Sequence, residues 1–420
     1  MGAIAPTSIV RAAGRLLALG LSAALGCAVA AGVEVGPAAA DQVRAEQWQL
    51  SALDARDAWK VSTGKGVIVA VIDSGVDAEH PDLAGQVLPG IDLVEPGSNN
   101  GGKVDPVGHG TTVAGLIAGS NRDKSGVEGI APGAKVLPIR VLDKANKYDD
   151  PGIVAQAVRW AVDHGAGVIN LSLGGALRSE AIAESLAYAA AHDVVVVACT
   201  GNIVTDPTTS RVWYPAREPG VIAVAGLGAA GAGGTESLWS GSLTGPETVL
   251  TAPAVNLTGA RPGGGYWQVQ GTSFAAPLVA GAAALVRARY PRMSAANVIN
   301  RLIWTAKDLG PKGRDDRFGY GEVDPVAALR STVAEVETNP LTEAGPAEAG
   351  AGLESSAEPL AQHGGAAPLP EASEFHVERL AEEQTRTSAV TGLTAMLLIS
   401  LGGAVGVLLH QRRKGSRPQP

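Results

Sequence analysis

The sequence predicts an α/β domain, built on a mainly parallel sheet with helices on both faces, followed by a single transmembrane helix. Between residues 63 and 330, branched apolar runs alternate with helical patterns, which is typical of parallel strands buried on both sides. The predicted strands span residues 67–72, 136–142, 168–171, 194–198 and 221–225. Nearer the C-terminus, residues 389–409 form a run of 21 residues without a charged side chain, about the length that a helix needs to cross a bilayer.

The N-terminal segment is typical of a secretory signal peptide. Arg11 and Arg15 precede the apolar run 16–33, and three alanines before Asp41 supply the small residues of a cleavage site. We therefore predict a signal peptide over residues 1–40 and a mature chain that begins near Asp41.

The whole chain has two cysteines, Cys27 and Cys199. Cys27 lies inside the predicted signal peptide, so cleavage leaves Cys199 alone and no internal disulfide can form. Lipoprotein processing at Cys27 is an alternative, but the residues before it lack the leucine that such sites usually have three positions earlier. We expect ordinary cleavage, and a domain whose stability comes from its core.

The C-terminal part predicts a tether. Residues 331–388 are rich in Ala, Glu, Pro and Gly and poor in aromatic residues, which is typical of a disordered linker. Their eleven glutamates and two arginines account for the net charge of −8, so that charge says little about the folded domain, and no basic patch suggests a nucleic-acid partner. The apolar span 389–409 precedes a basic tail, 410–420, which the positive-inside tendency places in the cytoplasm. The folded domain is then expected on the outer side of the cell membrane.

Three short motifs carry the groups of a catalytic triad: VIDSG around Asp73, GHGT around His109 and GTSFAAP around Ser273. A serine hydroxyl becomes nucleophilic near neutral pH when a histidine takes its proton and a carboxylate orients that histidine. Taken singly, His109 could be a core histidine and Ser273 a helix cap. The three motifs together favour nucleophilic catalysis.

The predicted elements bring these groups to one place. Asp73 follows strand 67–72 at its carboxyl end, where functional groups collect in parallel sheets. His109 stands at the start of a helical pattern. Ser273 opens a helix of small residues, whose positive end favours developing negative charge. Pro277 is expected in the first turn of that helix, where a missing N–H has no partner to lose.

Over residues 48–329 the sequence resembles the subtilisin-like serine proteases, in which the triad also runs in the order Asp, His, Ser. Three more segments are similar: VINLSLGG at 168–175, GN at 201–202 and TAP at 251–253. The resemblance implies a three-layer subtilisin-like fold over residues 63–330 and a serine-type endopeptidase that works through an acyl-enzyme.

The resemblance also implies a role for each residue of the site. Asp73 would orient His109, His109 would act as general base and Ser273 as nucleophile. The Asn202 side chain, together with the Ser273 backbone N–H, would stabilise the oxyanion.

Substrate contacts follow from the same resemblance. The backbone of Ser172, Leu173 and Gly174 would pair with the peptide as an added strand. Cys199 would stand in the wall of the pocket for the residue before the cut, where the family more often has alanine, and would favour small or slender side chains there. The alternative for Cys199 is a buried small apolar residue without a role in specificity.

The short extension 41–62 is too small to be an independently folded inhibitor. With the signal peptide, the linker and the membrane anchor, it resembles the mycosins, membrane-anchored subtilisin-like proteases associated with type VII secretion, as do QWQL at 47–50 and AW at 58–59. Mycosins often have paired cysteines, which this chain lacks. Thr112 stands where many secreted subtilisins have a second histidine. The resemblance implies a single-pass enzyme outside the cell membrane that processes an exported protein, with components of the secretion channel as partners.

Two other functions stay open. The domain could serve as a structural brace of the secretion complex with catalysis secondary, or as a broad degradative protease tethered to the cell surface. Triad chemistry requires no cofactor. Calcium binding is left open, because the acidic residues Asp77, Asp82, Asp105 and Asp123 are scattered without the spacing of a dedicated loop.

Overall fold

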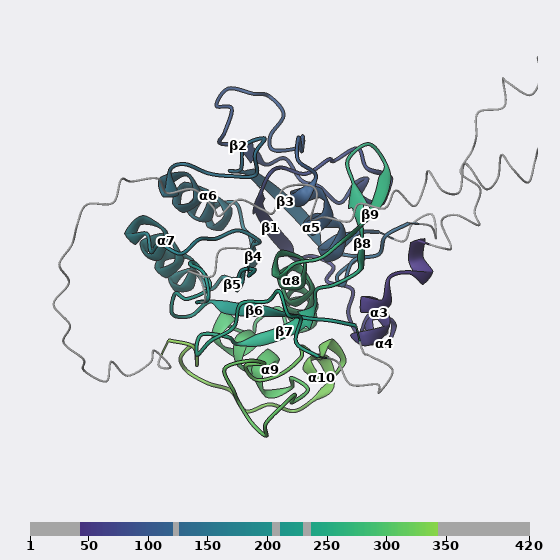
Figure 1. Cartoon of the computed structure of the whole chain (residues 1–420), viewed down its shortest axis with the longest axis vertical. Helices are drawn as coiled ribbons and strands as arrows, with labels where there is room; N and C mark the ends of the chain where they lie inside the picture. Colours follow the sequence, from purple (N-terminus) through teal and green to yellow (C-terminus); the bar gives the residue numbers. More distant parts are fainter. Residues whose placement is uncertain (1–42, 121–125, 204–210, 230–236, 343–420) are drawn as a thin grey trace, which may run out of the picture.

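The computed structural model describes residues 43–120, 126–203, 211–229 and 237–342. At its centre lies a seven-stranded parallel sheet in the order β2-β3-β1-β4-β5-β6-β7 (Figure 1). The strands are β1 Ile68–Asp73, β2 Ile91–Asp92, β3 Lys135–Arg140, β4 Val168–Leu171, β5 Val195–Cys199, β6 Ile222–Leu227 and β7 Leu250–Pro253. An antiparallel hairpin, β8 Leu257–Arg261 with β9 Gly265–Val269, follows the last strand.

The mainly parallel sheet predicted from the sequence is confirmed. The five predicted strands correspond to β1, β3, β4, β5 and β6, and their ends differ by no more than two residues. Residues 69–73 of β1 and all residues of β4 and β5 are buried, because both faces of the sheet are covered. The prediction missed β2, which has only two residues, and β7, whose sequence LTAP contains no run of branched apolar residues.

The helices are α3 Trp48–Ala52, α4 Ala55–Trp59, α5 His109–Ala118, α6 Pro151–Asp163, α7 Glu180–Ala191, α8 Thr272–Arg289, α9 Ala295–Trp304 and α10 Pro325–Arg330, with a 3-10 turn, η1, at Pro81–Leu83. Helices α6 and α7 lie side by side, and α5 packs against α8 (Figure 1). Residues 272–286 of α8 are all buried. A Cβ added to Gly281 would lie 2.8 Å from the Ile130 Cβ, so the small residues of α8 allow this close packing.

The N-terminal extension is part of the folded domain from residue 43 onward. Gln47 exchanges two hydrogen bonds of 2.9 Å with the backbone of Glu128. The indole N–H groups of Trp48 and Trp59 donate to the carbonyls of Val255, at 3.0 Å, and Ile130, at 2.8 Å. These bonds satisfy buried polar groups, and the extension thereby covers the core rather than forming a separate unit.

Residues 331–342, which we call the C-terminal strap, also pack on the domain, whereas the sequence predicts that the disordered linker begins at 331. Asn297 Nδ2 donates to the Val336 carbonyl at 2.9 Å, and Asn339 Nδ2 donates to the Gly220 carbonyl at 3.0 Å. Leu341 is 9% exposed. The bonds come from amide side chains on both partners, and the single asparagine of the strap is too weak a signal to predict this packing.

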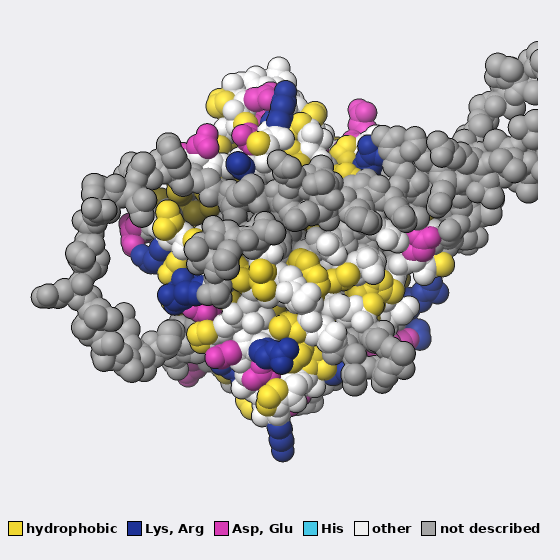
Figure 2. Space-filling view, in the orientation of Figure 1, with side chains coloured by type: hydrophobic (Ala, Val, Ile, Leu, Met, Phe, Trp, Pro, Cys, Tyr) yellow, Lys and Arg dark blue, Asp and Glu magenta, His cyan; other side chains and the backbone are white. Residues whose placement is uncertain are grey.

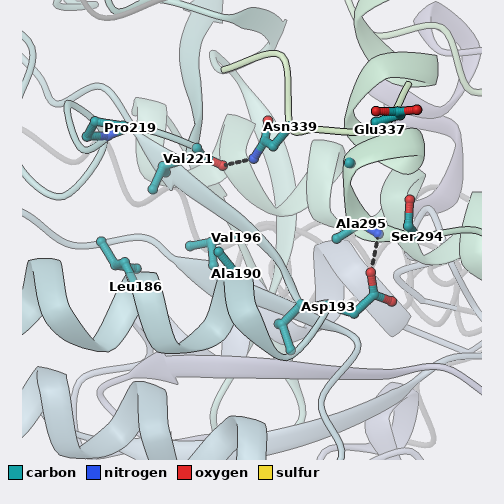
Figure 3. A pocket seen from close by; sticks show the side chains of 13 residues that line it. Leu186, Ala190, Asp193, Val196, Pro219, Val221, Ser294, Ala295, Glu337 and Asn339 are labelled. Atoms are coloured by element: carbon teal, nitrogen blue, oxygen red, sulfur yellow. Dashed lines mark hydrogen bonds between the residues drawn. The ribbon is translucent and has the colours of Figure 1, made fainter. Parts of the chain in front are cut away.

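The strap borders the pocket drawn in Figure 3, a hollow of about 260 Å³ between α7, α9 and the start of β6. Its wall combines apolar side chains such as Leu186 and Val221 with the acidic residues Asp193 and Glu337. No residue of the predicted triad lines it, so this pocket is separate from the site described below.

The predicted signal peptide, most of the linker, the apolar span 389–409 and the basic tail lie outside the described residues. Within the part of the chain that the structure describes, no helix combines the length and the apolarity needed to span a membrane. On the face drawn in Figure 2, acidic and basic side chains are interspersed among apolar ones where the surface is described.

Candidate active site

Asp73 and His109 form a buried pair at the carboxyl end of the sheet. Asp73 is the last residue of β1 and is fully buried, and His109 is the first residue of α5 and is 5% exposed. His109 Nδ1 lies 2.8 Å from Asp73 Oδ1, which also accepts the Ser74 backbone N–H at 2.7 Å. Because an ionised carboxylate only accepts hydrogen bonds, Nδ1 carries the proton and Nε2 is the basic nitrogen.

A second carboxylate, Asp105, supports the start of α5. Its Oδ1 accepts the hydroxyl of Ser74 at 2.8 Å and the backbone N–H groups of Val107 and Gly108 at 3.0 and 2.7 Å. Its Oδ2 accepts both the N–H and the hydroxyl of Thr111, at 2.8 and 2.6 Å. The sequence predicted no role for Asp105, although an aspartate shortly before a helix start is a common capping signal. Five bonds to one carboxylate fix the backbone on both sides of His109.

The electrostatic environment favours a protonated imidazole. Burial lowers the pKa of His109, but the charge of Asp73, its hydrogen bond and the charge of Asp105 all raise it, and the result is a pKa above the ordinary 6.5. His109 is therefore a stronger base than a free histidine, as a group that must take a proton from serine requires.

Ser273 stands in the first turn of α8, beside this pair. The ring of its neighbour Phe274 lies 5.1 Å from the His109 ring, centroid to centroid. The Ser273 hydroxyl contacts Cys199 Sγ at 3.8 Å, whereas His109 Nε2 is buried and has no hydrogen-bond partner among the described residues. The ring contact places the start of α8 beside His109, and no hydrogen bond joins the Ser273 hydroxyl to His109 Nε2, as is common in enzymes without substrate.

The predicted oxyanion residue, Asn202, is held at the start of the same helix. Its Oδ1 accepts the backbone N–H and the hydroxyl of Thr272, both at 3.0 Å. With the oxygen used in this way, the amide nitrogen is the end that can donate to a substrate. The Ser273 N–H lies in the first turn, where backbone donors have no acceptor within the helix. Both predicted donors of an oxyanion hole are thus at one helix N-terminus.

The predicted substrate strand is joined to the nucleophile helix by Ser172. Pro277 lies in the second turn of α8, so its expected place in the first turn was wrong. Its missing N–H would otherwise bond the Ser273 carbonyl, four residues earlier. The Ser172 hydroxyl donates to that carbonyl instead, at 2.6 Å. Ser172 therefore satisfies a buried acceptor that the proline leaves without its usual partner.

The neighbouring residues of this segment close its other side. Gly175 pairs antiparallel with Tyr214 through two backbone bonds of 2.9 and 2.8 Å. A Cβ on Gly174 would lie 2.5 Å from the Tyr214 carbonyl oxygen, so only glycine fits this approach. Leu173 is buried, with its carbonyl turned to Cys199.

Cys199 ends β5 and is 1% exposed. Its Sγ lies 3.9 Å from the Leu173 carbonyl oxygen in addition to its contact with Ser273. Burial raises the pKa of the thiol to about 11, so the sulfur is uncharged near neutral pH. The structure places Cys199 between the predicted substrate strand and the nucleophile.

The hairpin β8–β9 contributes a contact that sequence reasoning missed. Trp267 Nε1 donates to Thr112 Oγ1 at 2.7 Å, and the Thr112 hydroxyl donates to the carbonyl of Ala260 at 2.8 Å. A Cβ on Gly108 would lie 2.5 Å from the Trp267 ring, so the indole packs directly on the residue before His109. The hairpin that leads to Ser273 thus also holds the start of α5.

The scattered aspartates are engaged with protein groups. Asp77 accepts the Gly263 N–H at 2.8 Å, and Asp82 accepts the Val127 N–H at 2.7 Å. Asp123 lies outside the described residues. Among the residues that the structure does describe, no three His, Cys, Asp or Glu side chains come together as a metal site would require.

Comparison with known proteins places this geometry in a family. The model of the subtilase family matches residues 64–321. Fervidolysin of Fervidobacterium pennivorans is 38% identical over 321 residues, which cover 69% of this chain and 44% of that protein. Subtilisin DY of Bacillus licheniformis is 38% identical over 62% of this chain and 88% of its own length.

Solved structures agree with these relatives. The crystal structure of MycP1 from the ESX-1 type VII secretion system is similar with a TM-score of 0.61 and 30% identity, over 70% of this chain and 88% of that one. Mycosins are thus among the structural neighbours, as the sequence motifs predict. From the family match, these relatives and the site, the chain belongs to the subtilase family and is a serine endopeptidase.

Proposed function

We propose that this subtilase is a membrane-anchored, extracytoplasmic endopeptidase associated with type VII secretion, which processes an exported protein through an acyl-enzyme. The observation that carries the proposal is the buried Asp73–His109 pair of 2.8 Å, which lies beside the first turn of the helix that bears Ser273, where the Phe274 ring contacts the His109 ring. The similarity to MycP1, which comes from a type VII secretion system, supports the cellular setting.

The proposed reaction uses only groups of this chain. Ser273 Oγ attacks the carbonyl carbon of the scissile peptide bond while His109 Nε2 takes the hydroxyl proton. The negative charge moves to the carbonyl oxygen, which accepts hydrogen bonds from Asn202 Nδ2 and the Ser273 N–H. His109 then gives its proton to the leaving amine. Water, activated by the same imidazole, releases the acyl group, and Asp73 holds the imidazole in its tautomer throughout.

The contacts of the binding segment support an extended substrate. We propose that the peptide pairs with the backbone of residues 172–174, and that the side chain before the cut enters beside Cys199. The buried sulfur narrows that space, so small or slender side chains fit it best. Main-chain pairing of this kind accepts many sequences, and the choice of one exported protein then depends on location.

Two measurements on the full-length chain test the enzymatic part. A fluorophosphonate probe should label the wild type and leave Ser273→Ala unlabelled, and a library of internally quenched peptides should be cleaved by the wild type alone. Absence of both labelling and cleavage in a folded wild type would refute the proposed reaction.

A secretion assay in cells separates processing from a structural brace. If processing is the task, the wild type should cleave one exported protein and leave most surface proteins intact. Ser273→Ala should abolish that single cleavage. Normal secretion with lost cleavage would leave the structural brace as the alternative, whereas lost secretion with an intact complex would refute the brace. Cleavage of many unrelated proteins by the wild type would instead indicate a degradative protease.

A further inference from the structure

The nucleophile's hydroxyl has a partner other than the catalytic base. Ser273 Oγ lies 3.8 Å from Cys199 Sγ, within the range of a long, weak hydrogen bond to sulfur. Cys199 Sγ in turn lies 3.9 Å from the Leu173 carbonyl oxygen. Since the carbonyl can only accept, the thiol proton points to Leu173 and the serine proton points to sulfur. A short chain of hydrogen bonds therefore runs from the nucleophile to the predicted substrate strand.

His109, the proposed general base, correspondingly lacks the hydrogen bond that the Ser273 hydroxyl would be expected to donate. His109 is 5% exposed, and its Nε2 is buried with no hydrogen-bond partner among the described residues. An acceptor nitrogen and a donor hydroxyl, both buried at one site, normally bond to each other, because an unsatisfied buried polar atom is costly. Here the sulfur of Cys199 competes with Nε2 for the same proton.

The competing bond is weak enough to be broken on each turnover. The thiol is buried and stays uncharged near neutral pH, so its sulfur is a poor acceptor compared with a thiolate. A weak bond to sulfur favours one orientation of the Ser273 hydroxyl without preventing the others. A peptide that pairs with the Leu173 segment and fills the space beside the sulfur would disturb this chain of bonds.

We propose that Cys199 is a positioning residue, whose thiol holds the Ser273 hydroxyl away from His109 until substrate occupies the adjacent strand. The enzyme then rests with its serine unactivated, and binding of a peptide releases the hydroxyl to Nε2. This inference rests on the proposed function, because it assumes that Ser273 and His109 carry out the reaction.

The first test is Cys199→Ala, assayed with peptides that have glycine before the cut, so that the volume freed by the substitution is not filled by substrate. The released hydroxyl should raise kcat/KM by about two- to tenfold, the range of one weak hydrogen bond. The released hydroxyl should also bond neutral His109, so the pKa seen on the acid side of the pH profile should fall. Cys199→Ser, which keeps an acceptor, should stay close to the wild type in both respects.

The matched control is Val197→Ala, which opens a cavity in the same buried strand at a side chain that has no polar atom to bond the Ser273 hydroxyl. This substitution should lower the stability of the domain and leave unchanged the pKa that governs the acid side of the pH profile of kcat/KM. An equal pKa shift in Val197→Ala, or none in Cys199→Ala, would overturn the inference while leaving the proposed function intact. A wild type that hydrolyses no peptide would overturn both.

A second measurement avoids substitution of the cysteine. NMR titration of His109 in the wild type and in Ser273→Ala compares the imidazole with and without the hydroxyl. If sulfur holds the hydroxyl, removing it should leave the pKa of His109 unchanged. A clear rise of that pKa in Ser273→Ala would mean that the hydroxyl was bonded to Nε2 in the resting enzyme, and the inference would be wrong.

Discussion

Asp105→Asn tests how the structure supports the catalytic histidine. Asp105 is buried and accepts five hydrogen bonds, three on Oδ1 and two on Oδ2. An asparagine has nearly the same shape but keeps only one oxygen. If that oxygen faces Gly108 and its neighbours, the amide nitrogen faces the Thr111 N–H, and two donors then point at each other.

The size of the effect follows from these bonds. A buried donor without an acceptor costs about 1 to 3 kcal/mol, and the remaining bonds lose the extra strength that a charged acceptor gives them. We therefore expect Asp105→Asn to lower the free energy of unfolding by about 2 to 4 kcal/mol. For a domain of this size, that corresponds to a fall in apparent Tm of about 5 to 10 °C.

The same substitution should move the pH profile in a defined direction. The charge of Asp105 is one of the causes that raise the pKa of His109, so its removal should lower that pKa. Because the base must be neutral to act, kcat/KM should then rise with pH at a lower pH than in the wild type, where the rise is expected above pH 6.5.

The assay is the pH dependence of kcat/KM, with thermal unfolding measured on the same samples. Asp77→Asn is the matched control, because Asp77 accepts a backbone N–H of the hairpin but is not among the causes of the His109 shift. It should leave the acid side of the profile in place. An Asp105→Asn profile that stays where it was, or moves to higher pH, would refute this account of the site.

Three further predictions concern the oxyanion donor, the hairpin and the strap. Asn202→Ala should lower kcat by roughly 10²- to 10³-fold, as for the corresponding donor in a subtilisin, with little change in KM. Steady-state kinetics measure both constants, and a change in KM alone would contradict this prediction. Trp267→Phe and Thr112→Val each remove the 2.7 Å hydrogen bond between the hairpin and α5. A double-mutant cycle on the free energy of unfolding should give a coupling energy of about 0.5 to 1.5 kcal/mol. Additive effects of the two substitutions would argue against the bond. A chain cut after residue 342 should keep the wild-type Tm, while one cut after residue 330 should unfold several degrees lower, and equal Tm values would show that the strap does not stabilise the domain.

Features that a short stretch of sequence determines were predicted well. Three of the five strands found in advance are continuous apolar runs, and the other two are interrupted by one polar residue each, Arg140 and Asn170, because a strand buried on both faces needs mostly apolar residues on both. Asp73, His109 and Ser273 follow from motifs a few residues long, each attached to the end of a strand or the start of a helix. The positions of these groups in the sheet and helices then follow from the general placement of sites at strand ends.

Contacts between distant segments were not predictable in the same way. The bond between Trp267 and Thr112 spans 155 positions, and neither residue carries a local signal of the other. The strap is similar, because it is held by the asparagines of α9 and by its own Asn339, while the rest of its composition is that of a linker. Asp105 lies between the two cases, because four of its five donors belong to residues 107, 108 and 111 near the helix start, and only the Ser74 hydroxyl comes from a distant segment.

Pro277 shows how a local rule can fail for a reason that lies elsewhere in the fold. A proline in the second turn of a helix leaves one carbonyl without its N–H, which is why the first turn was the expected place. Here that carbonyl belongs to Ser273, and the hydroxyl that replaces the lost N–H belongs to Ser172, 101 positions earlier. The proline is therefore tolerated because the segment that contains Ser172 passes beside Ser273. The same irregularity that a helix would normally avoid connects the proposed nucleophile to the segment proposed to bind the peptide.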